Sequence, residues 1–211
     1  MRLKNSEVLK DGIMQLGLSI TADMQDKMLV YLTLLNKWNK VYNLTAIRDY
    51  NQMVSNHLLD SLSVLPYLWP SRWLDVGCGA GLPGLVLAVA KPDWQFVLLD
   101  SNSKKTSFVR QAVIELALDN VSVHNGRIEN WQTTMRFDGI ISRAFCELGE
   151  FLRSTNHLAA PQGRWAAMKG EAEQEIVKMP DGWQVEKFIT LCVPGVSASR
   201  SLVIATCKGT K

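Results

Sequence analysis

The first third of the chain carries apolar residues at helical spacing and shows no strand pattern. After Thr21, whose hydroxyl can cap a helix, apolar side chains recur every three to four residues as far as Trp38. A second periodic stretch follows Asp49 and stops at Pro66. This spacing predicts that residues 1–70 form a helical extension, packed on a domain that begins near residue 71.

Beyond residue 70, short apolar runs alternate with amphipathic stretches. The runs predict strands within 73–76, 94–99, 121–123, 137–141, 164–168, 185–193 and 202–207. The intervening stretches predict helices over 82–90 and 104–118, and a helix from Glu147 onward. Strands that alternate with helices form a mostly parallel sheet covered by helices on both faces. Residues 71–211 are therefore expected to form one α/β domain, with the last two strands as a hairpin-like pair.

The composition fits a globular protein of this kind. The chain has 211 residues, of which 47% are hydrophobic and 20% charged, so it suits one domain with a modest extension. This composition excludes a disordered or fibrous chain. No apolar run approaches the roughly 20 residues of a membrane-spanning helix, and the first residues lack the apolar region of a signal peptide. We therefore expect a cytoplasmic protein that has no membrane partner.

Metal and disulfide patterns are missing from the sequence. The four cysteines, at positions 78, 146, 192 and 207, form no CxxC pair, and the chain has three histidines. We expect neither a bound metal nor a disulfide framework. The net charge is +3, and its excess lies in residues 101–170, which hold nine Lys or Arg and six Asp or Glu. A polyanionic partner is compatible with this distribution but is not required by it.

The strongest motif is a glycine loop between a predicted strand and a predicted helix. It reads LDVGCGAGLPG over residues 74–84, and its strand runs into Gly77, Gly79 and Gly81. Glycines let a backbone turn tightly and approach a ligand closely. Asp100 ends the next predicted strand, where a carboxylate can accept both hydroxyls of a ribose. The motif therefore predicts a cofactor that contains a nucleoside.

Two kinds of cofactor fit the glycine loop. The spacing of Gly79, Gly81 and Gly84 satisfies the dinucleotide pattern, which would make the protein a nicotinamide-dependent oxidoreductase. The longer string from Asp75 through Gly77 is similar instead to the loop of S-adenosylmethionine methyltransferases. We favour S-adenosylmethionine, because dinucleotide loops usually lack the acid and open close to the N-terminus. A regulator that binds S-adenosylmethionine without catalysis is a third interpretation.

Several further segments, from about residue 20 to 205, carry a more specific resemblance. They are KWNKVYNLT (37–45), HLLDS (57–61), DVGCGAGLPG (75–84), LLDS (98–101), FVRQ (108–111), FDGIISRAF (137–145) and KG (169–170). On these segments the chain resembles the small-subunit ribosomal RNA methyltransferase G family, guanine-N7 enzymes also called glucose-inhibited division protein B. Many methyltransferases share the glycine loop, whereas the segments at 37–45 and 137–145 are much more specific.

The resemblance implies a Rossmann-like, class I methyltransferase fold with a seven-stranded sheet and an N-terminal helical cap. It implies S-adenosylmethionine as cofactor, and N7 of a guanine in the 16S ribosomal RNA of the small subunit as methyl acceptor. The family pattern places cofactor contacts on Gly77, Leu82, Ile128, Glu129 and Arg143, to which the loop motif adds Gly79 and Asp100. We expect the protein to act as a monomer.

Basic side chains near the predicted strand ends are the candidates for contact with RNA. They are Lys104, Lys105, Arg143, Lys169 and Arg200. Contacts of such residues with phosphates position a nucleic acid without reading its sequence. For each of them, an ordinary solvated charge is the alternative interpretation.

The residues after the fourth predicted strand narrow the choice of acceptor atom. Methylation of an exocyclic amine usually uses Asn/Asp-Pro-Pro-Tyr there, whereas this chain has SRAF at 142–145. Methylation of cytosine C5 needs a cysteine nucleophile, and Cys146 keeps that alternative open. Guanine N7 has a free lone pair and attacks without losing a proton, so we expect no catalytic acid or base. Arg143 is expected to position the guanine edge or the cofactor, with a structural ion pair as the alternative.

Overall fold

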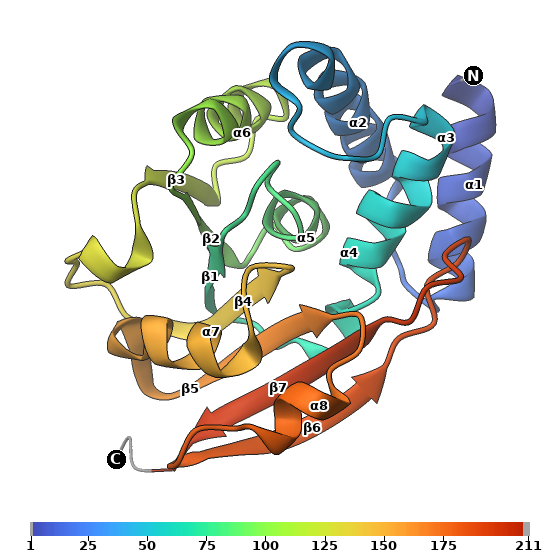
Figure 1. Ribbon diagram of the computed structural model, residues 1–211. Coiled ribbons are helices and arrows are strands. Elements are labelled where there is room, and N and C mark those ends of the chain that lie inside the picture. Colours follow the sequence, from blue (N-terminus) through green and yellow to red (C-terminus); the bar gives the residue numbers. More distant parts are fainter. Residues whose placement is uncertain (1, 209–211) are drawn as a thin grey trace.

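A seven-stranded sheet forms the centre of the protein, whose computed structural model describes residues 2–208 (Figure 1). The strands are β1 Arg72–Val76, β2 Gln95–Asp100, β3 Val121–Asn125, β4 Phe137–Arg143, β5 Ala159–Lys169, β6 Trp183–Thr190 and β7 Ser201–Cys207. Their order in the sheet is β3-β2-β1-β4-β5-β7-β6. Pairing is parallel from β3 to β5, while β7 runs antiparallel to both β5 and β6. The predicted seven-stranded, mostly parallel sheet is confirmed.

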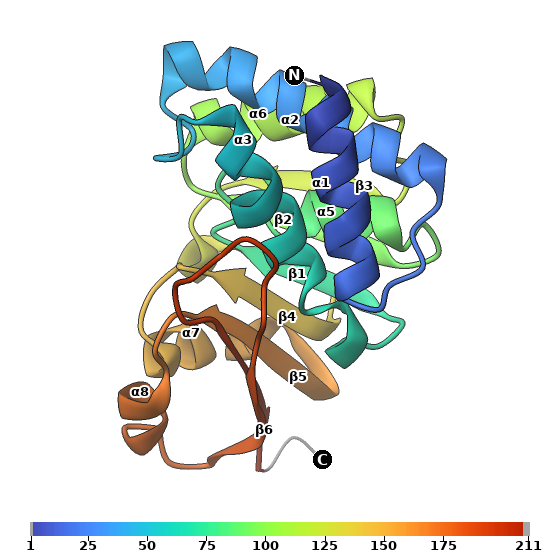
Figure 2. The same cartoon turned by 90° about the vertical axis from the view of Figure 1, so that its right-hand side faces the viewer.

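Helices cover both faces of this sheet (Figures 1 and 2). One face carries α1 Arg2–Gln15, α2 Ala22–Tyr42, α3 Tyr50–Met53, the π-helix η1 Val54–Leu59, α4 Asp60–Leu62, η2 Leu65–Tyr67, α5 Gly84–Ala90 and α6 Ser103–Glu115. The opposite face carries η3 Ile128–Asn130, α7 Leu148–Thr155, η4 Asn156–Leu158 and α8 Glu173–Val177.

Alternating side chains of the central strands separate two apolar cores. Phe96 and Leu98 of β2 belong to the core beneath α1–α6, whereas Val97 and Leu99 belong to the core beneath α7. Successive side chains of a strand point to opposite faces, so a strand buried on both faces reads as an unbroken apolar run. The N-terminal helices share the first core with α5 and α6. The division of the chain into residues 1–70 and 71–211 stays a prediction.

Side-chain caps fix the starts of helices α2 and α6. The hydroxyl of Thr21 accepts the N–H of Met24 at 3.3 Å, as its position in the sequence predicts. The side-chain oxygen of Asn102 accepts the N–H groups of Lys104 and Lys105 at 3.0 and 3.3 Å. Such caps satisfy N–H groups that have no partner within the helix. They therefore set where α2 and α6 begin.

Three differences from the predicted elements go beyond a shift of a few residues at an end that was already predicted. Strand β5 begins at Ala159 rather than Arg164, because Ala159 pairs with Phe137 ahead of a register shift, and residues 159–163 (AAPQG) contain no strand-forming apolar run. The short helix α8 was not predicted, and the helical stretch after Asp49 contains the π-helix η1. Within the part of the chain that the structure describes, no helix is both long and apolar enough to cross a membrane.

Candidate active site

The loop after β1 turns into α5 through three glycines with left-handed backbone. Gly77, Gly79 and Gly81 have φ angles of +67°, +58° and +86°, a region that residues with a Cβ rarely adopt. At Gly77 an added Cβ would also collide with the ring of Phe145, which covers this glycine from just beyond β4. The glycine at this position is therefore required both by the turn and by the close approach of Phe145.

Asp100 ends β2 and faces the glycine loop. Its Oδ2 accepts the N–H of Gly79 at 2.9 Å, and its Oδ1 accepts the N–H of Asn102 at 2.8 Å. A carboxylate has about four acceptor positions, so each oxygen retains a lone pair. The backbone thus orients the Asp100 carboxylate and leaves it able to accept hydrogen bonds from a ligand.

Two adjoining cavities lie at the carboxyl ends of the strands. The acidic cavity, which we name for Asp100 and Glu129 in its wall, has a volume of about 410 Å³. The arginine cavity, named for Arg143 and Arg200, has a volume of about 480 Å³. The wall residues that belong to both are Gly77, Lys105 and Ala144. Ligands of open parallel sheets bind at this edge, so the two cavities form one candidate site with two compartments.

An ion-pair cluster lies in the wall of the arginine cavity. Asp60 Oδ2 accepts a hydrogen bond from Nη1 of Arg143, and Asp60 Oδ1 accepts one from Nε of Arg200, both at 2.9 Å. Nη1 of Arg143 also donates to the main-chain carbonyl of Asn56 at 3.0 Å. Asn56 lies in η1 and Asp60 begins α4, so the N-terminal helices contribute directly to the site.

His57 lines the arginine cavity but is not a free base. Burial, and then the charge of Arg143, lower the pKa of His57 to about 4, so its ring is neutral at pH 7. Its Nδ1 lies 3.1 Å from the carbonyl of Asn56, and its Nε2 lies 3.1 Å from the hydroxyl of Thr45. The carbonyl can only accept, so Nδ1 carries the proton and Nε2 accepts. Both ring nitrogens are therefore used within the protein.

The thiols beside the cavities are protonated at neutral pH. Burial raises the pKa of Cys146 to about 11, and it raises the pKa of Cys78 well above its usual value. The thiolate is the nucleophilic form of cysteine. These surroundings do not favour the alternative in which Cys146 attacks cytosine C5.

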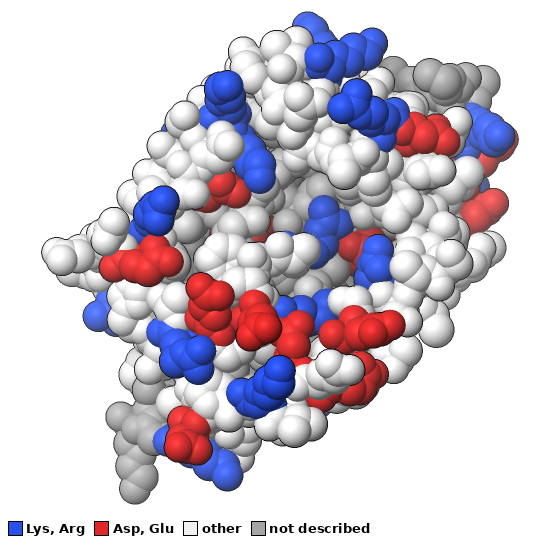
Figure 3. Space-filling model, in the orientation of Figure 1, with Lys and Arg blue, Asp and Glu red and all other residues white. Residues whose placement is uncertain are grey.

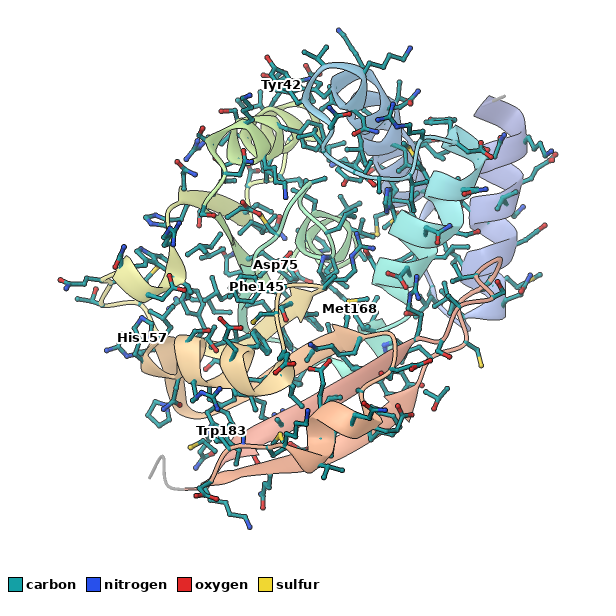
Figure 4. All side chains as sticks on the ribbon, in the orientation of Figure 1. Tyr42, Asp75, Phe145, His157, Met168 and Trp183 are labelled. Carbon is teal, nitrogen blue, oxygen red and sulfur yellow. The ribbon has the colours of Figure 1, made fainter. Side chains whose placement is uncertain are left out.

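Asp75 is a buried carboxyl group beneath the glycine loop. Its Oδ2 accepts the N–H of Gly84 at 2.8 Å, while its Oδ1 has no hydrogen-bond partner among the described residues. Burial raises the pKa of Asp75 to about 7. In Figure 4, Asp75, Phe145 and Met168 gather at the centre of the structure, whereas Trp183 lies far from them.

The residues predicted to contact the cofactor all lie in the cavity walls. Those of the acidic cavity are Asp100, Ile128 and Glu129, those of the arginine cavity are Gly79, Leu82 and Arg143, and Gly77 belongs to both. The structure thus brings together residues from the ends of β2 and β4 and from the loops that follow β1 and β3. Their contacts with a cofactor stay a prediction.

The residues predicted to contact RNA have more varied surroundings. Lys105 lines both cavities, and Lys104 is exposed beside it at the start of α6. Arg200 and Lys169 lie in the wall of the arginine cavity, but each is paired. Lys169 Nζ lies 2.8 Å from Glu175 Oε2. Because Glu175 lies on α8, this partner could not be foreseen from the predicted elements.

Charge is distributed unevenly around the site. Figure 3 shows Lys and Arg side chains over α2 and α6 on one side of the central hollow, and a band of Asp and Glu over α7 and α8 on the other. The exposed basic residues on the first side include Lys37, Lys40 and Lys104, and the exposed acids on the second are Glu147, Glu150, Glu171 and Glu173. The side formed by α2 and α6 is thus the more basic of the two.

Two further residues of the site, Tyr31 and Asp60, make contacts that sequence reasoning missed. The hydroxyl of Tyr31 donates to the carbonyl of Ala80 in the glycine loop at 2.8 Å, although its spacing marks it only as an apolar helix position. Asp60 lies within the HLLDS segment, but its arginine partners are 83 and 140 positions away along the chain. No local pattern signals either contact.

The strand order, the reversed β7 and the glycine loop facing Asp100 define a class I methyltransferase. A solved structure with this fold is the glycopeptide N-methyltransferase MtfA, complexed with S-adenosyl-L-homocysteine. It matches with a TM-score of 0.59 at 12% identity, over 71% of this chain and 89% of that one. The predicted class of fold is confirmed.

Sequence comparison gives the family. The family model for rRNA small subunit methyltransferase G matches residues 24–203. A protein from Methylobacillus flagellatus named ribosomal RNA small subunit methyltransferase G is 51% identical, over 92% of this chain and 95% of its own. A protein of the same name from Laribacter hongkongensis is 49% identical, over 96% and 98%. The chain belongs to the rRNA small subunit methyltransferase G family, as its motifs predict.

Proposed function

We propose that the protein transfers a methyl group from S-adenosylmethionine to N7 of a guanine in the 16S ribosomal RNA of the small subunit. Family membership makes it an S-adenosylmethionine-dependent ribosomal RNA methyltransferase. The observation that supports the choice of acceptor is the arginine cavity. This compartment adjoins the acidic cavity, presents guanidinium donors and holds no free general base.

The acidic cavity suits the adenosine part of the cofactor. Asp100 would accept hydrogen bonds from ribose hydroxyls through the lone pairs that its backbone partners leave free. Ile128 offers an apolar contact for the adenine, and Glu129 offers an acceptor. The missing Cβ of Gly77 would let the backbone approach the ligand. When bound, the cofactor supplies a methyl group on a positively charged sulfur.

The arginine cavity suits a guanine presented by its O6/N7 edge. Arg143 uses Nη1 for Asp60 and Asn56, while its other N–H groups have no acceptor within residues 2–208. An arginine donates readily to O6 of guanine, and such a bond would leave N7 free to attack the methyl group. No proton has to be removed from N7, so the residues need only align the base and exclude water.

Approach of the RNA is proposed to use the basic side of the site. Lys104 and Lys105 would contact phosphates, and Arg143, Lys169 and Arg200 would act within the arginine cavity. Lys169 would first have to exchange its bonds with Glu175 and with the main-chain carbonyl of Cys146. No group of three or more potential metal ligands occurs among the described residues. A metal-free reaction, a monomer and a cytoplasmic location stay predictions.

Mass spectrometry of 16S ribosomal RNA tests this function. Small subunits that lack the modification are incubated with the protein and labelled S-adenosylmethionine, and we expect one N7-methylguanine. The single-turnover rate should stay nearly flat across neutral pH, because N7 has no proton to lose to a catalytic base. Arg143→Lys should lower the rate by about 100-fold, because it loses the planar fork. Arg164 lies outside both cavities, so the matched control Arg164→Lys should leave the single-turnover rate unchanged. A methyl group on cytosine C5 or on an exocyclic amine would refute the proposal.

A further inference from the structure

Asp60 joins two arginines that come from distant parts of the chain. Arg143 ends β4, and Arg200 immediately precedes β7. Each guanidinium donates to a different carboxylate oxygen at 2.9 Å. The side chain of Asp60 is 3% exposed, so both of its oxygens are committed to these two arginines rather than to water.

Main-chain carbonyls hold the same guanidinium groups at a second point. The carbonyl of Asn56 accepts from Arg143 Nη1 at 3.0 Å, and the carbonyl of Ser199 accepts from Arg200 Nη1 at 2.9 Å. Asn56 lies in the π-helix η1, and π-helical turns are rare and occur frequently at functional sites. Each arginine is thus anchored by Asp60 and by one carbonyl.

The remaining donors are left for the arginine cavity. Arg143 Nε and Nη2, and Arg200 Nη2, have no protein acceptor in the described part of the chain. Both side chains line the cavity and are 22% and 27% exposed. The N–H groups of a guanidinium lie in one plane, so fixing one edge fixes the direction of the others.

We propose that Asp60 is a positioning residue for methyl transfer. It holds Arg143 so that its free N–H groups meet O6 of the target guanine, and it holds Arg200 toward an adjacent RNA phosphate. This inference rests on the proposed function. An arginine that is not held samples many rotamers, and two guanidinium groups this close repel each other. The shared Asp60 carboxylate restricts the arginine rotamers and offsets the repulsion between the two guanidinium groups. The cost of burying this carboxylate is offset by its two hydrogen-bonded partners.

A positioning role and a purely structural role predict different effects of Asp60→Asn. The change keeps the size of the side chain but removes its negative charge, so the local field becomes more favourable to RNA. The new amide offers one acceptor and two donors, so it cannot hold both guanidinium groups. Positioning therefore predicts a lower rate with equal or tighter RNA binding. A structural role predicts that stability, affinity and rate fall together.

Single-turnover methyl transfer to small ribosomal subunits tests the proposal, together with cofactor affinity by calorimetry and subunit affinity by filter binding. For Asp60→Asn we expect a rate at least about 50-fold lower, with cofactor affinity within about threefold and subunit affinity unchanged or higher. Asp60→Glu restores the charge and should recover part of the rate. The matched control Glu186→Gln breaks an Arg164–Glu186 pair of 3.4 Å outside both cavities and should leave the rate unchanged.

A folded Asp60→Asn variant whose rate stays near that of the unmodified chain would overturn the proposal. A loss of rate matched by an equal loss of subunit affinity would also overturn it. If this variant does not fold, Arg200→Gln opens one pair from the more exposed side. A lower rate at unchanged cofactor affinity then supports the role of the cluster, and an unchanged rate overturns it. The unmodified chain separates the two claims, since its failure to produce N7-methylguanine would refute the proposed function itself.

Discussion

Replacing Gly77 by alanine tests a central feature of the site, a backbone that borders both cavities without a side chain. Gly77 has a φ of +67°, and an ideal Cβ there would press into the ring of Phe145, with Cγ and Cε2 at 3.2 Å. The left-handed conformation costs a residue with a Cβ roughly 1–2 kcal/mol. The Phe145 ring must also move by roughly 1 Å to restore a carbon–carbon contact of about 3.5 Å.

Cofactor binding should be weakened beyond the loss of stability. Gly77 and Phe145 both line the acidic cavity, so the new methyl group and the displaced ring take space from the ligand. We expect the dissociation constant for S-adenosylmethionine to rise at least tenfold in calorimetry, which corresponds to about 1.4 kcal/mol. Backbone strain alone should lower the unfolding temperature by roughly 2–8 °C.

A matched glycine isolates the cost of the backbone conformation. Gly17 also has a φ of +67°, but nothing lies within 4 Å of its added Cβ. Gly17→Ala should therefore show the strain and leave cofactor affinity unchanged. The double variant Gly77→Ala/Phe145→Ala should lose the clash with the ring but keep the backbone strain, so its unfolding temperature should match that expected from strain alone. If folded Gly77→Ala binds the cofactor as tightly as the unmodified chain does, the reasoning is wrong.

Three further perturbations follow from the charges and ionisations of the site. Burial raises the pKa of Asp75 from 3.8 to about 7, so its contribution to stability is complete below about pH 4 and is lost as pH rises through about 7. Relative to Asp75→Asn, the unmodified chain should lose up to about 4 kcal/mol of unfolding free energy over that window, and parallel stability curves would contradict this. Cys146→Ser should leave the methylation rate nearly unchanged, because burial raises the thiol pKa to about 11, and a trapped covalent RNA adduct would contradict this. Replacing Lys104 and Lys105 by alanine should reduce the slope of log affinity against log salt by about 2, whereas an unchanged slope would exclude them as phosphate contacts.

The strands of the central sheet could be predicted because burial on both faces leaves a simple signal. Residues 96–99 of β2 are all apolar, and the glycines after β1 mark where that strand stops. The start of β5 gave no such signal, since residues 159–162 are partly or fully exposed and only Ala159 among them pairs with β4, ahead of a register shift. The π-helix η1 was hidden because the apolar spacing around it fits an ordinary helix equally well.

The site could be predicted where its partners lie within one motif and not where they are distant. The glycine loop and Asp100 come from neighbouring strands in a known order, so their meeting at Gly79 follows from the sequence pattern. The cluster of Asp60, Arg143 and Arg200 depends on how the N-terminal helices pack against the ends of β4 and β7. Sequence spacing carries no information about that packing.

The negative charge of Asp60 also bears on the proposed reaction, because methylation at N7 leaves the guanine positively charged. As the methyl group is transferred to N7, positive charge moves toward the arginine cavity, whose wall already contains Arg143 and Arg200. Two unit charges about 4 Å apart interact by about 4 kcal/mol at an effective dielectric constant of 20. Two uncompensated arginines would therefore oppose the transfer they align. A carboxylate shared between them at 2.9 Å offsets much of that repulsion while keeping the N–H groups in place. An exocyclic amine would in addition have to give up a proton, and the arginine cavity holds no free base to accept it, so this cluster suits N7 better than an exocyclic amine.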